Sequence, residues 1–403
     1  MTDTQQETKP QGTDLSRAFS EDGHIKTHVG GQALIEGIMM RGKYNWAVAV
    51  RKPDGQIVVE ERDLASGKKK NGWLYWPLVR GCRAFVESLM LSFKALEVSS
   101  AHAYDSEGFT FGMTEEEKNK WREQDAKDAA KRKEKQAKKV SKLAARKGIS
   151  EQEALALLEE KSQEKDASSA SESQEEPFFG KGEMAISMVV GLLLGLGLFI
   201  VAPAVVSNLI VGEYDSNPLV WNLVDGVLRV AIFIFYIWLI GRMKDIKRMF
   251  GYHGAEHKAI HCFEHGLPMT VENARKFPCL HVRCGTAFLI MVMIIAILVY
   301  TVIPLKPLFA SMGVPDGPIK LLLVIVTRIV FMPLIAGISY EITVKWAGSH
   351  PENPLVKVIL WPGMQMQYLT TNEPDDAQIE CAIAAMQAVL DREEREEQGQ
   401  PAA

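Results

Sequence analysis

Four long apolar runs between residues 184 and 340 limit most strongly what this chain can fold into. They cover residues 184–211, 219–240, 286–304 and 319–340. Each is close to the ~20 residues that a helix needs to cross the hydrocarbon core of a bilayer. The sequence therefore predicts an α-helical integral membrane protein with four transmembrane helices. The polar first residues contain no apolar signal-peptide core, so we expect the first helix to act as the insertion signal.

Basic residues predict the orientation of these helices, since lysine and arginine gather in cytoplasmic loops. The segment between the second and third helices is rich in them, at Arg242, Lys244, Lys247, Arg248, Lys258, Arg275, Lys276 and Arg283. The loop "GEYDSNP" after the first helix has none. We therefore expect a multi-pass protein of the bacterial inner (cytoplasmic) membrane with both termini in the cytoplasm. There the five cysteines need not pair.

Polar segments flanking the helices predict a small cytoplasmic α+β unit. Alternating residues at 46–50 and 57–61, joined by a Pro-Asp-Gly turn, indicate a β-hairpin, with 32–40 as a third strand. Residues 73–101 have apolar residues at helical spacing with Arg80, Arg83 and Lys94 interspersed, which predicts an interfacial amphipathic helix rather than a tilted fifth membrane helix.

A C-terminal amphipathic helix is expected to pack on this unit. Asn372 is its predicted N-cap, with Pro374 in the first turn and Asp375 at the third position. Its apolar face is formed by Ile379, Ala382, Ile383, Met386 and Leu390.

Residues 105–182 form a charged, low-complexity insert without an apolar face to bury. The basic run 131–146 is diluted by acids and has no interleaved aromatic residues, so a solvated insert is favoured over nucleic-acid binding.

The chain thus divides into eight predicted segments: a disordered tail 1–25, the hairpin and interfacial helix 26–104, the insert 105–182, two membrane helices 183–241, a histidine-rich segment 242–285, two further membrane helices 286–341, a C-terminal segment 342–392 and a charged tail 393–403.

The motif "GYHGAEHKAIHCFEHG" places four histidines at intervals of four, from His253 to His265. Residues four apart on an α-helix differ by only about 40° in direction, so His253, His257 and His261 share one face. Glu264 projects between the directions of His253 and His257. Ligand-type side chains therefore converge on one stripe of this helix.

A divalent metal site is the functional interpretation of this stripe. His257 and His261 have the spacing with which two imidazoles bind one ion, Glu264 adds a carboxylate, and "LHVRCG" adds His281 or Cys284. These ligands favour Zn²⁺, with Fe²⁺ or Mn²⁺ as alternatives. Glu256 is the candidate base and His253 an outer partner or ligand.

The structural alternative is that the histidines merely sit at the headgroup level of an interfacial helix. The strict spacing, two glutamates and a following histidine and cysteine favour a metal site. His265, before Gly266, is expected to end the helix.

Charged residues within the apolar runs form a second constellation. Asp225 and Arg229 are four apart in the second helix, and Arg328 lies midway through the fourth. They predict either a structural ion pair or a polar cavity for a lipid-like headgroup. Glu341, at the end of the fourth helix, is expected to reach the histidine helix.

Five motifs together carry a family resemblance: "GGQALIEGIMMRG", "YHGAEHKAIHCFEHG", "TVENARKFPCLHVRCGTAFL", "MPLIAGISYEI" and "PGMQMQYLTTNEPDDAQIECAIAA". The chain resembles the YqhQ-like bacterial membrane proteins over residues 28–104 and 180–390. That family is described as predicted metal-dependent enzymes with a domain of unknown function. The resemblance implies that the metal-type positions are His253, Glu256, His257, His261, Glu264, His281 and Cys284. It implies no substrate.

The sequence features favour some classes of function over others. Proteolysis is disfavoured because "HExxH" and "EExxxR" patterns are missing, and transport because no repeat is visible. A metal-dependent hydrolase or transferase at the inner leaflet, acting for example on a lipid-linked substrate, remains. Its alternative is a non-catalytic, metal-stabilised scaffold that assists membrane-protein assembly.

Overall fold

The computed structural model describes residues 29–64, 72–103 and 181–398, with gaps at 215, 283, 304, 306–308, 310, 316, 348–349 and 351–352. The predicted tail 1–25 and residues 105–180 of the predicted insert lie outside this part of the chain.

The described elements are four strands and a larger set of helices. The strands are β1 (Gly30–Leu34), β2 (Gly37–Arg41), β3 (Asn45–Arg51) and β4 (Ile57–Asp63). The helices are η1 (Gly72–Tyr75), α2 (Val79–Ala103), α5 (Lys181–Leu196), η2 (Gly197–Val201), α6 (Ala202–Val211), α7 (Pro218–Ile240), α8 (Lys244–Glu264), α9 (Val271–Arg275), α10 (Gly285–Val302), α12 (Pro318–Tyr340), η3 (Glu341–Ala347), α13 (Pro354–Thr370) and α14 (Asp376–Glu397).

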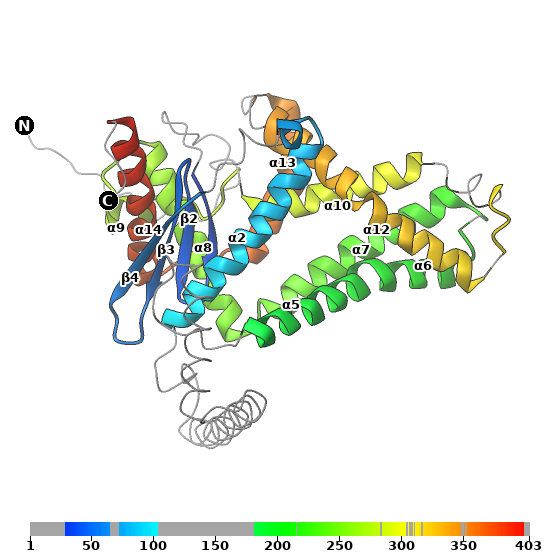
Figure 1. The fold of residues 1–403 in the computed structure, drawn as a ribbon, viewed down its shortest axis with the longest axis horizontal. Coiled ribbons are helices and arrows are strands. Elements are labelled where there is room, and N and C mark those ends of the chain that lie inside the picture. The colour runs from blue at the N-terminus through cyan, green and yellow to red at the C-terminus, as the bar shows by residue number, and fades with distance from the viewer. Residues whose placement is uncertain are drawn as a thin grey trace, which may run out of the picture.

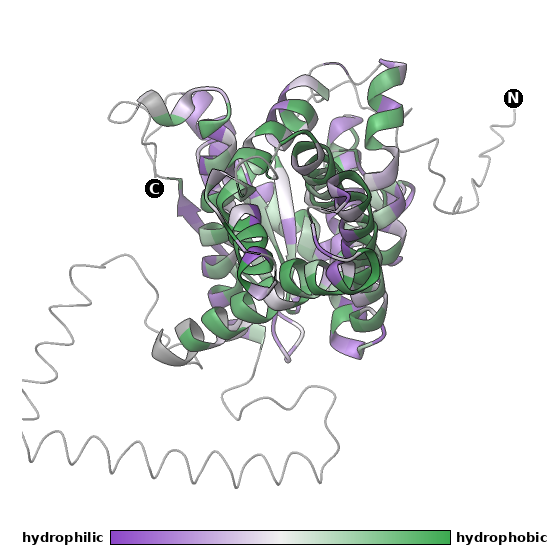
Figure 2. Ribbon diagram, turned by 90° about the vertical axis from the view of Figure 1, so that its right-hand side faces the viewer, coloured by the Kyte–Doolittle hydropathy of each residue, from purple (hydrophilic) through white to green (hydrophobic). Residues whose placement is uncertain are grey.

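The four predicted membrane helices are confirmed. Within the described residues, four helices are long and apolar enough to span a membrane: Val189–Val211, Pro218–Ile240, Gly285–Val302 and Pro318–Ala347. In Figure 1 they form an elongated bundle that extends to one side of the sheet. Figure 2, which looks from the free end of this bundle, shows that its helices are predominantly hydrophobic. The chain is therefore a multi-pass membrane protein.

An antiparallel meander, ordered β1-β2-β3-β4, forms the N-terminal sheet. The predicted hairpin is present as β3 and β4, which pair from Arg51 and Ile57 outward. The single predicted strand 32–40 is wrong: the chain reverses at Ile35 and Glu36, and β1 pairs with β2 from Leu34 and Gly37. Neither turn residue is glycine, proline or asparagine, so the usual sequence signal for a turn is missing.

The central strands β2 and β3 are buried on both faces of the sheet, to which their alternate side chains point. Ile38, Met40, Ala47 and Ala49 pack with α8 and α14. Met39, Trp46, Val48 and Val50 point the other way and pack with α2. Helix α2 in turn contacts α12 at its other end. It is therefore the layer between the sheet and the bundle, and it is not among the four candidate spans.

Two C-terminal expectations are corrected. Asn372 is not the N-cap of the last helix; Asp375 is, because its carboxylate accepts from Gln378 N at 2.8 Å while Gln378 Oε1 accepts from Asp375 N at 3.1 Å. The helix continues to Glu397, so the tail predicted from residue 393 is helical for one further turn. A whole helix, α13, was not predicted; it packs against α10.

Candidate metal centre

Helix α8 and the segment that follows it supply every predicted ligand. After α9, residues 277–282 and Cys284 lie beside α8, held there by Lys258. Its buried ammonium group donates to the carbonyls of Arg275 at 3.1 Å and Phe277 at 2.6 Å, and pairs with Glu373 at 2.8 Å. A buried cation with three acceptors fixes this segment more firmly than apolar contact alone. From the sequence, Lys258 contributes only to the predicted orientation of the membrane helices.

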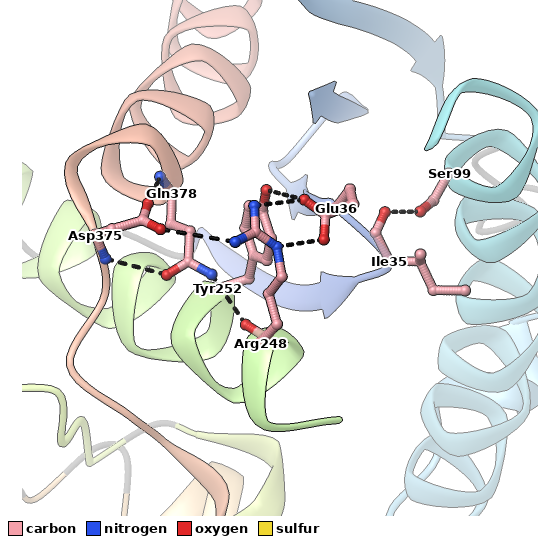
Figure 3. Close-up of polar contacts among 7 residues, drawn as sticks. All are labelled: Ile35, Glu36, Ser99, Arg248, Tyr252, Asp375 and Gln378. Carbon is pink, nitrogen blue, oxygen red and sulfur yellow. Dashed lines mark hydrogen bonds and ion pairs between the residues drawn. The ribbon is translucent and has the colours of Figure 1, made fainter. Parts of the chain in front are cut away.

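The first β-turn fixes the position of α8 against the sheet. Glu36 has a positive φ of 50°, a conformation that non-glycine residues adopt at a cost. Its carboxylate compensates by accepting from Arg248 Nη2 at 2.8 Å and from Tyr252 Oη at 3.1 Å, both on α8 (Figure 3). Arg248 also lies beside Asp375, while its carbonyl accepts from Gln378 at 3.0 Å. Sheet, α8 and α14 therefore meet at one polar junction.

The structure gathers the six predicted ligands into two adjacent groups of three. His253, His257 and Cys284 form one, which we call the cysteine triad, and His261, Glu264 and His281 form the other, the glutamate triad. In each, one potential ligand atom per residue lies within 4.8 Å of the others. The expected single set of His257, His261, Glu264 and a closing residue is therefore not what the fold forms. Two turns of helix separate His253 from His261, too far for one ion.

Backbone carbonyls fix the tautomers of three histidines. Nδ1 of His253 donates to Thr370 O at 2.8 Å and Nδ1 of His257 to Cys279 O at 2.5 Å. For His261 the roles are exchanged, because Nε2 donates to Leu280 O at 2.8 Å. A ring nitrogen facing a carbonyl must carry the proton, so in a neutral ring the other nitrogen keeps its lone pair.

These lone pairs lie in the interior of the cluster. Within the described part of the chain, Nε2 of His257 and Nδ1 of His261 are buried and have no hydrogen-bond partner. The rings are close: centroids lie 4.5 Å apart for His253 and His257, and 4.6 Å for His261 and His281. Ligating histidines in proteins almost always donate their second ring N–H in this way. The residues present fit a divalent metal ion.

The electrostatics of the cysteine triad favour an anionic sulfur. Burial raises the pKa of the Cys284 thiol, but His253 and His257 outweigh it and hold that pKa well below its usual range. Burial lowers the pKa of His253, yet Cys284, 3.1 Å from Nε2, and Glu256 raise it to about 9. A thiolate is the form of cysteine that binds metals, and an incoming ion would displace the His253 proton.

In the glutamate triad, by contrast, the imidazoles are neutral. Burial, with His257, lowers the pKa of His281 to about 3. Burial, with His281, also lowers the pKa of His261 well below its usual value. Nε2 of His281 lies 3.3 Å from Oε2 of Glu264. Neutral imidazole is the ligand form, so this triad is ready for a cation at neutral pH.

Glu256, the candidate base, lies next to the cysteine triad. Gly31 of β1 makes room for it: a Cβ at that position would lie 2.8 Å from Glu256 Cδ. Burial raises the pKa of Glu256, partly offset by His253 and His257. Its Oε2 atom is buried and, among described atoms, accepts no hydrogen bond. The carboxyl group is therefore held at the cluster with one oxygen uncommitted.

A cavity of about 760 Å³ adjoins both triads. His253, Cys284, Glu256 and Glu264 line it, so residues of both groups face the same space. The remaining lining comes largely from small and apolar residues of α2, α10, η3 and α13. This size is typical of a site for one small molecule.

Gln367 on α13 was not predicted, although it holds His281 at both backbone atoms. Its Oε1 accepts from His281 N and its Nε2 donates to His281 O, both at 2.8 Å. The motif "PGMQMQYLT" contains it, but without a predicted helix its direction could not be inferred.

Glu341 does not reach the histidine helix as expected. It forms an ion pair with Arg80 of α2 and accepts from Leu78 N at 3.3 Å. Its position at the end of α12, where α2 crosses, explains this choice of partner. His265 ends α8 as expected, with Nδ1 donating to His261 O at 2.7 Å.

The intramembrane charges lie far from this centre and contact one another. Asp225 Oδ2 accepts from Arg328 at 2.5 Å and from Arg229 at 2.9 Å. Arg328 also donates to Asn222 at 2.8 Å, and the Tyr300 hydroxyl donates to the Arg328 carbonyl at 2.7 Å. The three charged residues therefore form one cluster, with Asp225 at its hub, rather than a simple pair.

Comparison with known proteins identifies a family and a relative that match most of the chain. Residues 76–392 match the family model described as "Protein of unknown function (DUF1385)". The chain is 27% identical over 371 residues to "Uncharacterized protein YqhQ" of Bacillus subtilis (strain 168), covering 92% of this chain and 95% of that protein. No solved structure matches. The family resemblance seen in the sequence motifs is thus confirmed, and the chain belongs to the DUF1385 family.

Proposed function

We propose that the protein is a metal-dependent enzyme, a hydrolase or transferase, that acts at the cytoplasmic face of the bacterial inner membrane. The observation that carries the proposal is the set of fixed tautomers: three histidines donate one ring N–H each to a backbone carbonyl and keep the other nitrogen inside the cluster. A merely structural histidine would use both nitrogens in hydrogen bonds. Here Nε2 of His257 and Nδ1 of His261 are buried without a partner among the described residues, and Nε2 of His253 faces Cys284 Sγ at 3.1 Å.

The types of ligand limit which divalent metal ion the triads would bind. Two imidazoles with a thiolate favour Zn²⁺, and two imidazoles with a carboxylate suit Zn²⁺ or, with open positions, Fe²⁺; Mn²⁺ is the less suited alternative. A bound divalent ion supplies Lewis acidity to a carbonyl or phosphoryl oxygen of the substrate. Each triad has only three protein ligands, the number found in catalytic zinc sites.

The chain's own residues supply the rest of the chemistry. Glu256 lies beside the cysteine triad and lines the cavity, so it can hold a proton taken from an attacking water or hydroxyl and return it to the leaving group. The apolar residues of the cavity exclude water from the substrate. This arrangement favours an enzyme over the alternative, a metal-stabilised scaffold for membrane-protein assembly, which needs neither cavity nor base.

A second enzyme class is favoured by one contact. His253 Nε2 lies 3.1 Å from Cys284 Sγ, within reach for activating a cysteine nucleophile. Such an enzyme would function without metal.

Elemental analysis of purified protein tests the metal centre. Wild type should contain a divalent transition metal, His257→Ala should lose the ion of the cysteine triad, and His261→Ala that of the glutamate triad. Glu256→Gln is the matched variant, because it changes no proposed ligand: it should keep the metal but lose the cellular function of the wild-type gene in a deletion strain. A metal-free wild type would refute the centre, and activity in that form would favour the cysteine nucleophile. Full function in metal-loaded Glu256→Gln would favour the scaffold.

The orientation is part of the proposal and has its own test. Lys276 is exposed beside the centre, and Ser216 is exposed in the loop between α6 and α7. In intact cells a membrane-impermeant thiol reagent should label Ser216→Cys above the level of the parent protein but not Lys276→Cys. The reverse pattern would place the centre outside the cytoplasm.

A further inference from the structure

The walls of the cavity show what kind of molecule would reach the two triads. Several lining residues belong to candidate membrane spans: Ile237 of α7, Phe288 and Leu289 of α10, and Val344 of η3. Leu289 and Val344 also have a large exposed fraction, as has Phe85 of α2. The cavity is therefore open beside apolar residues of spans whose surface the hydrocarbon phase of a membrane would cover.

Helix α2 forms the opposite wall with a stripe of small residues. Gly81, Ala84, Ser88 and Ser92 line the cavity at intervals of three or four, so they share one face of the helix. Their size leaves the space open along about three turns.

One end of this wall is fixed at a close helix crossing. A Cβ on Gly81 would lie 2.8 Å from Tyr340 Cβ, and one on Gly337 would lie 2.7 Å from the Leu78 carbonyl. The other end is fixed at the sheet, where the Ser92 hydroxyl donates to Gln32 Oε1 at 2.5 Å and so joins α2 to β1. With both ends held, the stripe between them remains an elongated space.

Polarity within the cavity is segregated. Its imidazole, carboxyl and thiol groups, from His253, Glu256, Glu264 and Cys284, come from α8 and from the residue directly before α10. The α2 stripe and the spans contribute the apolar and hydroxyl part. A ligand that fits both regions has one reactive polar group and one hydrocarbon chain.

From these four observations we infer that the cavity holds a single lipid hydrocarbon chain, which enters from the membrane between α2 and the ends of α10 and α12, with its polar linkage at the triads. A volume of about 760 Å³ suits one chain rather than a whole two-chain lipid. The inference rests on the proposed function for what happens at the polar linkage, and it names the substrate class as a single-chain amphiphile. Fatty acyl and isoprenyl chains share this chemistry.

Photolabelling in membranes tests the inference with diazirine probes of both kinds, a long-chain fatty acid and an isoprenyl alcohol. After ultraviolet irradiation, labelled peptides of the full-length protein should map to the α2 stripe and to the start of α10. Ala84→Trp fills the cavity and should abolish labelling there. Met90→Trp is the matched variant, since Met90 is exposed on α2 and does not line the cavity, and it should label like wild type. Whichever probe labels identifies the chain.

Ser88→Phe provides a second cavity-filling variant in case the first disturbs folding. The circular dichroism spectrum and thermal unfolding of each preparation, together with its metal content, serve as the check on folding. Loss of cavity labelling with metal retained supports the inference. Equal labelling of wild type and both filled variants, or labelling confined to the outer surface of the bundle, would overturn it. Labelled but metal-free wild type would refute the metal centre alone, whereas metal-loaded protein that neither probe labels would refute the lipid chain alone.

Discussion

Two buried polar clusters, one within the membrane bundle and one at the triads, differ in how their hydrogen-bonding groups balance. Helix α10 joins them: Cys284 directly precedes it and Tyr300 lies near its far end, a separation of roughly 24 Å at 1.5 Å per residue. In the bundle, arginine donors face the acceptors Asp225 and Asn222, and the two groups left there without a described partner, Arg229 Nε and Asp225 Oδ1, are one donor and one acceptor. At the triads, three histidines each use one ring N–H on a backbone carbonyl, and His253 Nε2 faces the Cys284 sulfur. The lone pairs of His257 and His261 remain without a described partner.

This difference separates a structural cluster from a binding cluster. A set of donors and acceptors that satisfy one another stabilises a fold without any ligand. A surplus of acceptors facing inward is unfavourable unless a cation joins them. Both clusters are buried, so burial does not distinguish them. The balance between hydrogen-bond donors and acceptors in each cluster does distinguish them.

The largest loss of stability is expected from removing Asp225, the carboxylate that both arginines of the bundle share. Asp225→Ala leaves Arg229 and Arg328 without their shared carboxylate, and should lower the free energy of unfolding in detergent by about 3–5 kcal/mol. Arg328→Ala should cost clearly less, because Asp225 and Arg229 still neutralise each other. Chemical denaturation followed by circular dichroism measures both. If Arg328→Ala proves the more damaging variant, the hub is not Asp225.

An intermediate effect is expected at the triads from a residue that binds no metal. Gln367→Leu removes both hydrogen bonds that hold the backbone of His281, and should weaken metal affinity about 10- to 100-fold, as loss of an outer-shell partner does. Gln365→Leu, two residues earlier on the same helix, makes the same chemical change and should leave the affinity near that of wild type. Competition with a fluorescent chelator reports the affinity. Equal affinities in the two variants would contradict the positioning role.

The smallest effect concerns pH, to which the two clusters should respond differently. His281 and His261 have pKa values below the ordinary 6.5, so the unfolded chain binds protons that the metal-free fold excludes. Their stabilising contribution is complete above about pH 6.5 and is lost as pH falls toward the folded pKa, about 3 for His281. From pH 7 to 6 these two histidines should cost the chelator-treated protein roughly 1 kcal/mol, and the raised pKa of His253 should offset part of this loss.

Two variants assign this pH slope to its source. His281→Gln should flatten it, while Asp225→Asn, which changes a group of the other cluster, should shift stability without changing the slope. A slope that survives His281→Gln and His261→Gln together would place the titrating groups elsewhere.

The membrane helices were predictable because length and lack of charge suffice to define a span, and these are properties of a continuous segment. The strand pair β3 and β4 was predictable for a similar reason, since the Pro-Asp-Gly turn between them is a local signal. Glu36 gave no such signal, because its positive φ is maintained by Arg248 and Tyr252, more than 200 residues away. The turn depends on tertiary contacts.

For the candidate site, too, local spacing was predictable and tertiary contacts were not. Histidines spaced by four share a helix face, so the sequence could indicate which residues gather. It could not show how they divide into two triads, because that depends on His281 and Cys284, and so on the path of residues 277–284. The tautomers depend on carbonyls of Thr370, Cys279 and Leu280. Backbone carbonyls leave no trace in side-chain patterns.

Packing of helices on both faces of the sheet has a consequence for biosynthesis. One of its faces is covered by α8 and α14, and the contact from Lys43 to Glu393 spans 350 residues. At a translation rate of about 5–20 residues per second, α14 emerges roughly 20–70 s after the strands. The four candidate membrane spans are synthesised between them. Until α14 emerges, Ile38, Met40 and their neighbours lack part of the cover that they have in the folded protein, even after α8 has been made. Folding of this face therefore cannot be completed during translation until the last helix has been synthesised.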